Sequence, residues 1–391
     1  MKKFTNNLLG ILALISAATV SVSAQDSTKT FTLSGTVDAY FRTAFGSTNG
    51  AIGGYAPSTA FADLKGFSLG MANLVAAYDG EKAGFVADLV FGPRGKAAVF
   101  AAASGQSIIN QMYAYYKFSD VVTLNLGQFN TFLGYEVISP AVNFHYSTSY
   151  LFSWGPFSHS GARADFTFPN GMNMKLAIMN PTDLVEFNPV DTYTFGFQLG
   201  YANEAGGIWF NAVVGDQDGK LEKQLGGDVM SSTGVLSQGD ITLGFNLSEK
   251  FYLGLNTSLQ SLATGEYYDV DEGSIKDASG DATSYFGVAL YPKVTLSESF
   301  ALGLRAEYFA IKNGHLGGFD PITGYNSIIG VDDEGNGSVM EFTLSANVIK
   351  GGLTFIPEFR IDMSSEDSFL DKDGKATKML PSLNLAAVYK F

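Results

Sequence analysis

Cysteine is absent from this 391-residue chain, histidine occurs only three times, and charged residues make up only 16% of the total. The lack of cysteine excludes a disulfide scaffold and any metal site or nucleophile built on a thiol. Acidic residues outnumber basic ones by 38 to 24, which gives a formal net charge of −14. This acidic balance argues against nucleic-acid binding, which needs a basic surface.

The chain also has little continuous apolar sequence. After residue 24 no uncharged apolar run reaches the roughly 20 residues that a helix needs to cross a bilayer. A shorter apolar run, Leu8–Val20, follows the positive start Met1–Lys3 and precedes a small-residue cleavage site. This layout is typical of a secretory signal peptide. We therefore expect residues 1–24 to be cleaved, the mature protein to begin at Gln25, and residues 25–391 to form a single domain.

Glycine and aromatic residues are abundant instead, with 45 Gly, 32 Phe and 19 Tyr. Many short aromatic segments between Gly, Asn and Asp turns indicate an all-β protein. Apolar and polar residues alternate in these segments with the period of two that a strand requires. In the last segment, Leu383, Leu385 and Tyr389 share one face, whereas Asn384 and Lys390 share the other. Such alternation on segment after segment indicates a transmembrane antiparallel up-and-down β-barrel rather than a sandwich.

The lengths of the connections favour the same fold. Short turns such as Ser119–Asp120 alternate strictly with long loops such as Gly46–Ala60, as periplasmic turns and extracellular loops do. We expect about 16 strands, to within two, because residues 52–61 and 97–109 are ambiguous. A barrel of this size is too wide for side chains to fill, so its lumen should hold water. The strands are expected to begin near Phe31, Phe67, Gly84, Met112, Val121, Gly161, Met172, Tyr193, Ile208, Ile241, Phe251, Tyr285, Phe300, Val339, Leu353 and Leu383.

Candidate catalytic and metal-binding residues are few. His145 and His159 lie too far apart for a zinc motif such as H-E-x-x-H. Serines flank His159, but neighbours on a strand point to opposite faces, and a hydrolase would also need an orienting group and an oxyanion hole. Acidic turns such as Asp371–Gly374 are predicted to be plain turns, with a divalent-ion site as the less favoured alternative, because none completes an EF-hand. We therefore expect no enzymatic activity, no metal and no cofactor.

Charged residues occur on the face that is expected to point into the barrel. They could pair with one another across neighbouring strands, or they could set up a transverse field that orders water and selects polar solutes. These two roles are compatible. The expected pore-lining charges are Asp38, Arg42, Arg163, Asp165, Arg305, Glu307, Glu358 and Arg360.

The loop Asn130–Phe157 differs from the other long loops, because it is strongly aromatic and Glu136 is its only acidic residue. Outside the barrel it would expose a large apolar patch, so we expect it to fold inward and form a constriction. The alternative is an aromatic girdle at a strand end. A buried Glu136 would need a basic partner, for which Arg42, Arg163, Arg305 and Arg360 are the candidates. The expected constriction residues are Glu136, Tyr135, His145 and Tyr146.

Three stretches of the sequence, Leu126–Glu136, Asn143–Phe152 and His159–Arg163, resemble the OmpL-like β-barrel porin family of bacterial outer membranes. The likeness covers nearly the whole mature chain and is most specific between residues 124 and 181. It implies an outer-membrane porin, but the family does not supply a solute. The final Phe391 resembles the C-terminal assembly signal that the barrel-insertion machinery recognises.

These features favour a porin of a Gram-negative outer membrane that lets small hydrophilic solutes and ions diffuse through the lipid bilayer. The alternative is a non-conducting barrel that binds a ligand or partner through its extracellular loops. A homotrimer is one option for its assembly. Acidic loops such as Ala263–Thr283 should concentrate cations at the mouth, while the inward arginines oppose this deeper down. The sequence therefore predicts a modest cation preference.

Overall fold

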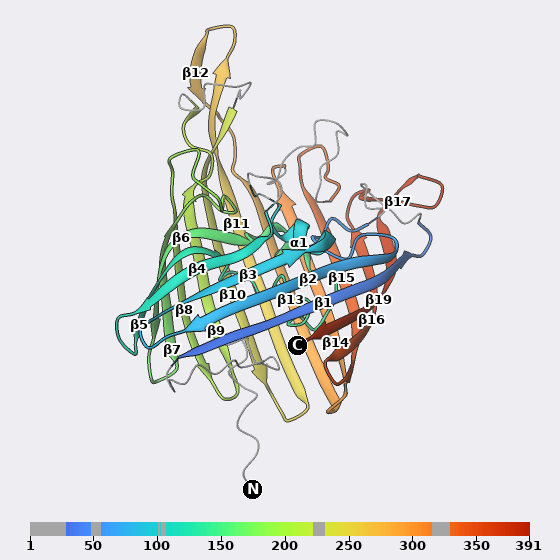
Figure 1. Ribbon diagram of the computed structural model, residues 1–391. Coiled ribbons are helices and arrows are strands. Elements are labelled where there is room, and N and C mark those ends of the chain that lie inside the picture. The colour runs from blue at the N-terminus through green and yellow to red at the C-terminus, as the bar shows by residue number, and fades with distance from the viewer. Residues whose placement is uncertain (1–28, 48–55, 101, 103–106, 222–230, 315–328) are drawn as a thin grey trace.

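A computed structural model describes residues 29–47, 56–100, 102, 107–221, 231–314 and 329–391. Sixteen strands form a closed antiparallel barrel, because β1 (Thr30–Ala44) pairs with both β2 (Gly66–Asp79) and β19 (Met379–Lys390) (Figure 1). The other barrel strands are β3 (Ala83–Phe91), β4 (Ile109–Lys117), β5 (Val122–Asn130), β6 (Ser158–Thr167), β7 (Met172–Met179), β8 (Thr194–Asn203), β9 (Gly206–Asp216), β10 (Ser231–Asn246), β11 (Phe251–Asp269), β13 (Thr283–Ser297), β14 (Phe300–Lys312), β15 (Gly337–Lys350) and β16 (Leu353–Ser364). The predicted fold and the count of sixteen strands are confirmed. Fifteen strands begin within four residues of the predicted position, whereas β10 begins at Ser231, ten residues before the predicted Ile241.

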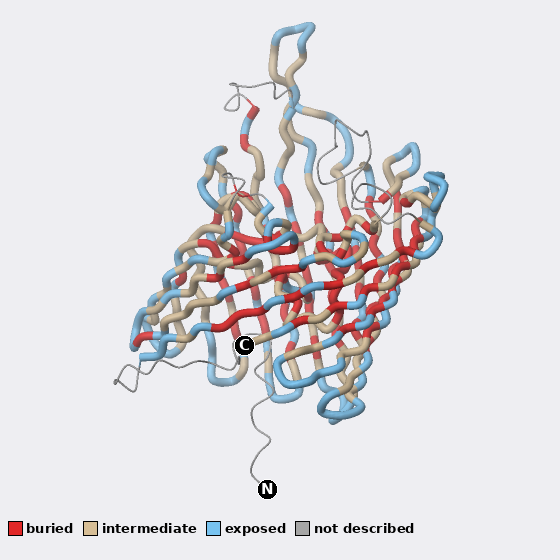
Figure 2. Tube along the Cα trace, turned by 45° about the vertical axis from the view of Figure 1, so that its right-hand side comes forward, coloured by how far each residue is buried: buried red, intermediate tan, exposed pale blue. Residues whose placement is uncertain are grey.

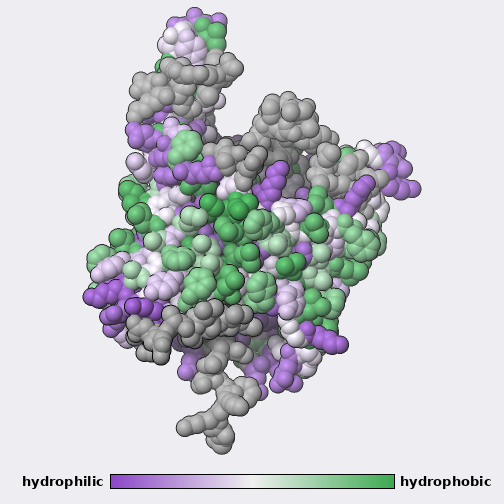
Figure 3. All heavy atoms as spheres, viewed as in Figure 1, coloured by the Kyte–Doolittle hydropathy of each residue, from purple (hydrophilic) through white to green (hydrophobic). Residues whose placement is uncertain are grey.

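The alternation of apolar and polar residues in the sequence places apolar side chains on the outer face of the barrel and polar ones on the inner face. On β16, Phe355 and Phe359 are 46% and 44% exposed on the outer surface, whereas Glu358 and Arg360 point inward and are buried. Figure 2 shows this alternation of buried and exposed positions along the strands. In Figure 3 hydrophobic residues gather around the middle of the barrel, and hydrophilic residues become frequent toward both ends. The outer surface is therefore suited to the hydrocarbon core of a bilayer.

Short turns and long loops occupy opposite ends of the barrel, as the sequence predicts. The long-loop end carries two features that the periodicity does not predict. The first is α1 (Gly92–Ala98), which ends just inside the ambiguous stretch 97–109 and has a proline in its first turn. The second is a tall hairpin, in which β11 continues past the barrel to pair with β12 (Ser274–Asp277) (Figure 1). Strands thus occupy part of the predicted loop Ala263–Thr283.

The remaining elements are short. β17 (Phe369–Leu370) pairs with β18 (Ala376–Thr377) in the loop before β19, and α2 (Tyr150–Trp154) interrupts the loop before β6. Neither described helix has the length and apolar character needed to cross a membrane. The acidic turns are closed by their own side chains; Asp371, for example, accepts hydrogen bonds from the amides of Asp373 and Lys375. This is the turn geometry that the sequence favours over an ion site.

The seam of the barrel is completed by Phe391. Its backbone exchanges two hydrogen bonds of 3.1 Å with Gly35, which extends the pairing of β19 with β1. Any side chain at position 35 would collide with the Phe391 ring, so a glycine is required there. The role of Phe391 as an assembly signal stays a prediction. The expected signal peptide, residues 1–24, and His315 lie outside the described residues.

Candidate functional site

The loop Asn130–Phe157, hereafter the lumen loop, packs against the inner wall of the barrel. Its Tyr150 and Leu151 share one buried cluster with Tyr285 of β13 and Phe309 of β14. Tyr146, which is fully buried, packs in a second cluster with residues of β1, β16 and β19. The loop therefore contacts a continuous part of the wall, hereafter the locked wall, which consists of β1, β13, β14, β15, β16 and β19. Its first residues reach other strands as well, because Phe132 and Leu133 pack with Met179 of β7 and Val213 of β9.

Glycines on the inner wall make room for the large side chains of the lumen loop. A methyl group built at Gly287 would lie 2.6 Å from Leu151, and one built at Gly196 would lie 2.6 Å from Phe132. Contacts of this length force the neighbouring side chain to move, so a glycine at each position lets the loop side chain lie directly against the wall. The same relation holds for Gly254 with Tyr135 and for Gly303 with Phe144. Glycines on four different strands thus leave the space that large side chains of the loop occupy.

Glu136 pairs with Arg305, one of the four arginines that the sequence offers as partners. The guanidinium lies 2.7 Å from Glu136 and 2.9 Å from Glu341 on the neighbouring strand, and these side chains are essentially inaccessible to water. Arg305 also donates a hydrogen bond of 2.8 Å to the carbonyl of Ser147. Removing one member of such a buried network would leave an uncompensated charge, so the network fixes the loop to β14 and β15.

A second arginine repeats this arrangement on β16. Arg360 lies 2.7 Å from Asp362 and donates a hydrogen bond of 2.8 Å to the carbonyl of Thr148. The hydroxyl of Tyr150 donates to the same Asp362 at 3.1 Å. Arg360 therefore joins the wall to the middle of the lumen loop, two strands away from Arg305.

Inward carboxylates accept hydrogen bonds from the backbone of the loop. Glu358 accepts from the amide of Tyr146 at 2.8 Å, and Glu307 accepts from the amides of Tyr150 and Leu151, both at 2.8 Å. Irregular backbone inside a barrel needs such partners, because an unpaired buried amide is costly. Asp38 extends the pattern to β1 by accepting from the Tyr146 hydroxyl at 2.6 Å.

Of the two described histidines, His145 belongs to the lumen loop and His159 lies on β6 directly after it, and each imidazole contacts one hydroxyl group. Nδ1 of His145 lies 2.8 Å from the hydroxyl of Ser345, and Nε2 of His159 lies 3.0 Å from the hydroxyl of Thr131. Both imidazoles are buried. No cluster of three or more His, Asp or Glu that could hold a metal ion occurs in the described part of the chain.

A different environment surrounds inward side chains of β4 and β6, and the stretch of wall from β4 to β6 is hereafter the open wall; Asn125 of β5 within it and Lys175 of the neighbouring β7 are buried. Arg163 pairs with Asp165 on its own strand at 2.8 Å, not with Glu136, and their side chains are 12% and 24% exposed. Tyr113 of β4 is likewise only half-buried. Of the eight expected pore-lining charges, only Arg163 and Asp165 keep this exposure; the buried ones are Asp38, Arg42, Arg305, Glu307, Glu358 and Arg360.

Comparison with known proteins identifies the family. A family model described as "Putative beta-barrel porin-2, OmpL-like" matches residues 30–391. The chain belongs to this family. It is therefore an outer-membrane β-barrel of the porin type, as the resemblance in the sequence implies. None of the curated proteins matches the sequence.

Solved structures similar to this OmpL-like porin share its fold at low sequence identity. OmpT of Vibrio cholerae, in a trimer form, is 11% identical with a TM-score of 0.56, covering 93% of this chain and 100% of that one. The outer membrane channel DcaP of Acinetobacter baumannii is 13% identical with a TM-score of 0.57, covering 94% and 99%. An anion-selective porin from Comamonas acidovorans is 12% identical with a TM-score of 0.56, covering 93% and 100%. These likenesses concern the fold alone.

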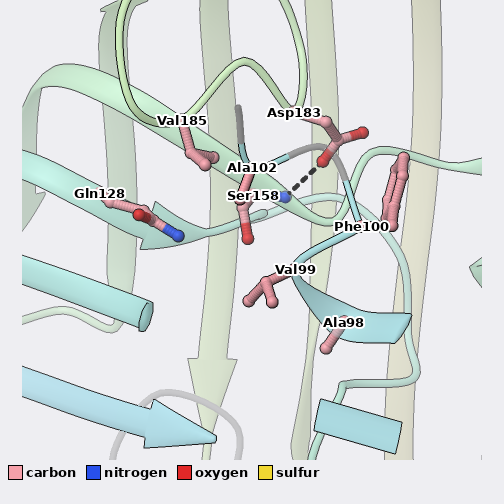
Figure 4. A pocket seen from close by; sticks show the side chains of 8 residues that line it. All are labelled: Ala98, Val99, Phe100, Ala102, Gln128, Ser158, Asp183 and Val185. Carbon is pink, nitrogen blue, oxygen red and sulfur yellow. Dashed lines mark hydrogen bonds between the residues drawn. The ribbon is translucent and has the colours of Figure 1, made fainter. Parts of the chain in front are cut away.

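Two cavities of this OmpL-like porin adjoin the lumen loop, and neither is predicted by the sequence. The larger, of about 170 Å³, is lined by Tyr40, Arg94 and Tyr146 among others. The smaller has room for about one water and lies between the end of α1 and the loop before β8 (Figure 4). There Asp183 accepts a hydrogen bond of 2.8 Å from the amide of Ser158, and burial raises the pKa of Asp183 to about 6. Asp183 thus holds the exit of the lumen loop.

Proposed function

We propose that this OmpL-like porin is a passive diffusion channel for small hydrophilic solutes and ions. The observation that carries the proposal is a closed barrel of sixteen strands in which buried ion pairs anchor one inward loop to the locked wall, while inward side chains of β4 and β6 keep exposed surface. A barrel of this size encloses more space than its wall side chains fill. The lumen loop occupies part of that space, and the partly exposed side chains of the open wall border the rest.

The proposed route runs beside the lumen loop, along β4 to β6. Inward side chains of β4, from Gln111 to Lys117, and the pair Arg163 and Asp165 of β6 keep exposed surface there. A loop that filled the whole lumen would give the alternative, a non-conducting barrel that binds a ligand or partner through its outer loops. The exposure of the open wall supports the channel instead.

In this proposal the four expected constriction residues hold the lumen loop in its position inside the barrel. Glu136, His145 and Tyr146 are buried against the locked wall, and the hydroxyl of Tyr135 donates a hydrogen bond of 2.8 Å to Tyr252. Their contacts fix how far the loop extends into the lumen. The constriction is then formed by the side of the loop that faces the open wall.

The orientation, the lack of enzymatic activity and the assembly state belong to the same proposal. Long loops face the outside and both ends of the barrel sequence face the periplasm, as in the general plan of outer-membrane barrels. No chemical step is assigned to the barrel. A homotrimer is the proposed assembly, and sedimentation of the purified protein in detergent would test it.

Single-channel recording in planar bilayers tests the channel. We expect the folded wild-type protein to give channels, and replacement of residues 132–156 by a short Gly-Ser linker to raise their conductance about twofold or more, because the narrowest cross-section limits flow. Shortening the hairpin tip at residues 266–279, which lies outside the barrel, is the matched control and should leave conductance unchanged.

Two outcomes would contradict the proposal. Folded wild-type protein that never opens a channel would favour the non-conducting alternative. If the loop replacement changes neither the conductance nor the solute size limit, the lumen loop does not form the constriction. A gel shift on heating, which separates folded from unfolded barrels, shows in each case that the protein tested is folded.

A further inference from the structure

The inward carboxylates of the barrel are already engaged by partners within the protein. Asp240, for example, accepts hydrogen bonds from the amide of Gly134 at 3.0 Å and from the side chains of Asn211 and Asn256 at 2.8 and 2.6 Å. Asp165 is held by Arg163 and by Asn125. Each of the following accepts at least one hydrogen bond: Asp38, Asp88, Asp165, Asp240, Glu307, Glu341, Glu358 and Asp362.

Two inward lysines are not engaged in this way. Within the described residues, the ammonium groups of Lys175 on β7 and Lys293 on β13 have no hydrogen bond and no ion pair to a carboxylate. Lys175 stands opposite Asp165 in the strand register, but that carboxylate is already bound by Arg163. Lys293 lies 4.6 Å from the ring centre of Tyr252 and contacts no acid. Both ammonium groups therefore keep hydrogen-bond donors for other partners.

Both lysines lie at the same depth, near the short-turn end of the barrel. Lys175 is three residues from the start of β7, and Lys293 is four residues from the end of β13. At about 3.3 Å per residue these positions are roughly 10 to 13 Å into the barrel. Arg163, four residues from the end of β6, reaches the same level. We call Arg163, Lys175 and Lys293 the basic belt.

The other strands place uncharged residues at the level of the basic belt. Glycine, aliphatic, aromatic or amide side chains stand three or four residues from their short-turn ends; examples are Asn125, Gly254, Gly303, Asn347 and Ile356. The nearest inward acids are Asp165, two residues from the end of β6, and Asp88 and Glu358, each five residues from the start of its strand. All three carboxylates accept hydrogen bonds within the protein, whereas Lys175 and Lys293 donate none among the described residues.

The acidic loops lie at the other end of the barrel. A strand of 14 residues spans about 46 Å, whereas the Debye length is about 8 Å at physiological salt. Charges on the long loops are therefore screened at the basic belt, and the local groups decide which ions pass. The net charge of −14 does not describe the field at that level.

We propose that the basic belt makes the lumen selective for small anions, and that the solutes of this channel carry carboxylate or phosphate groups. The inference rests on the proposed channel function. An anion passing the belt meets the donor groups of Lys175 and Lys293, whereas a cation meets no unpaired carboxylate. This differs from the modest cation preference that the acidic loops predict, and one measurement decides between them.

The measurement is the reversal potential across a KCl gradient. We expect wild-type channels to prefer chloride, and the double variant Lys175→Gln/Lys293→Gln to lower the chloride-to-potassium permeability ratio about threefold or more, because each lysine contributes to a potential of several kT in the lumen. The matched control Lys372→Gln/Lys375→Gln removes the same charge from the loop before β19 and should keep the wild-type ratio. Lys175→Arg/Lys293→Arg should also keep it.

The possible results separate this inference from the channel proposal. Conducting wild-type protein that prefers potassium would overturn the inference and leave the channel standing. So would an unchanged permeability ratio in the double Gln variant, provided that the heat-dependent gel shift shows it folded. Folded protein without channels would overturn both. Replacing chloride by acetate and then by phosphate in the same channels shows which of the two anion classes is admitted.

Discussion

The locked wall and the open wall use the same kinds of ion pair in different surroundings. Arg305 with Glu341 and Arg163 with Asp165 both join neighbouring side chains at 2.8 to 2.9 Å. The first pair is inaccessible to water because the lumen loop covers it, whereas the second keeps exposed surface. A buried pair has lost its hydration and depends wholly on its partners, whereas an exposed pair is supported by water. The same chemistry therefore fixes a loop on one side of the barrel and borders the proposed route on the other.

The largest expected effect is on stability. Arg305→Met leaves the buried Glu136 without a cation and Glu341 with only Arg360 at 3.7 Å, and we expect it to lower the free energy of unfolding by about 3–5 kcal/mol. Arg163→Met removes the more exposed arginine and should cost about 1 kcal/mol. Urea titrations followed by the loss of the folded gel band would measure both. Equal losses in the two variants would remove the distinction between the locked wall and the open wall.

A smaller effect is expected where the loop and the wall touch through a glycine. Gly303→Ala places a methyl group against the ring of Phe144, and we expect overpacking to cost about 1–3 kcal/mol. Gly239→Ala is the matched control, because a methyl group there meets no atom within 4 Å, and its effect should stay within about 0.5 kcal/mol. If both variants unfold at the same urea concentration, the fit of the loop to the wall contributes little.

The smallest expected effect is a change with pH at the exit of the lumen loop. Burial raises the pKa of Asp183 from 3.8 to about 6, so folding favours its protonated form between these values. Its contribution to stability is therefore present below about pH 4 and lost as the pH rises through 6. Asp183→Asn should reduce the difference between urea midpoints measured at pH 4 and pH 7.

The exposed Asp191 of the same loop supplies the control for this pH experiment. Asp191→Asn should keep the wild-type pH dependence, because its side chain is exposed. A wild-type dependence that also persists in Asp183→Asn would assign the titration to another group.

Most of the barrel follows from the sequence because strand periodicity and turn chemistry are local. The sixteen strands could be predicted from alternating residues and from the lengths of the joins, but the start of β10 at Ser231 lies ten residues before the predicted one. α1 could not, because Gly92–Ala98 begins with Gly-Pro-Arg-Gly, which reads as a turn. The extension of β11 was also missed, since its polar, solvent-exposed strands lack the apolar face on which the alternation depends.

The site was only partly predictable because it depends on contacts between distant segments. The aromatic composition of the lumen loop indicates that it is covered, and the lone Glu136 indicates a basic partner. The choice of Arg305 over Arg163 depends on where the loop crosses the barrel, which no local pattern encodes. The role of Glu358 as an acceptor for loop amides was likewise hidden, because its sequence neighbours only place it on the inner face.

The contacts of Tyr146 also depend on the closure of the barrel. Its hydroxyl binds Asp38, 108 residues earlier in the chain, and its amide binds Glu358, 212 residues later. Glu358 lies on β16 and Asp38 on β1, so these two acids face the same point only when β1 and β19 have met. Contacts of such long range form slowly. The bonds of Tyr146 to Asp38 and Glu358 therefore join the loop to both sides of the seam and report its closure.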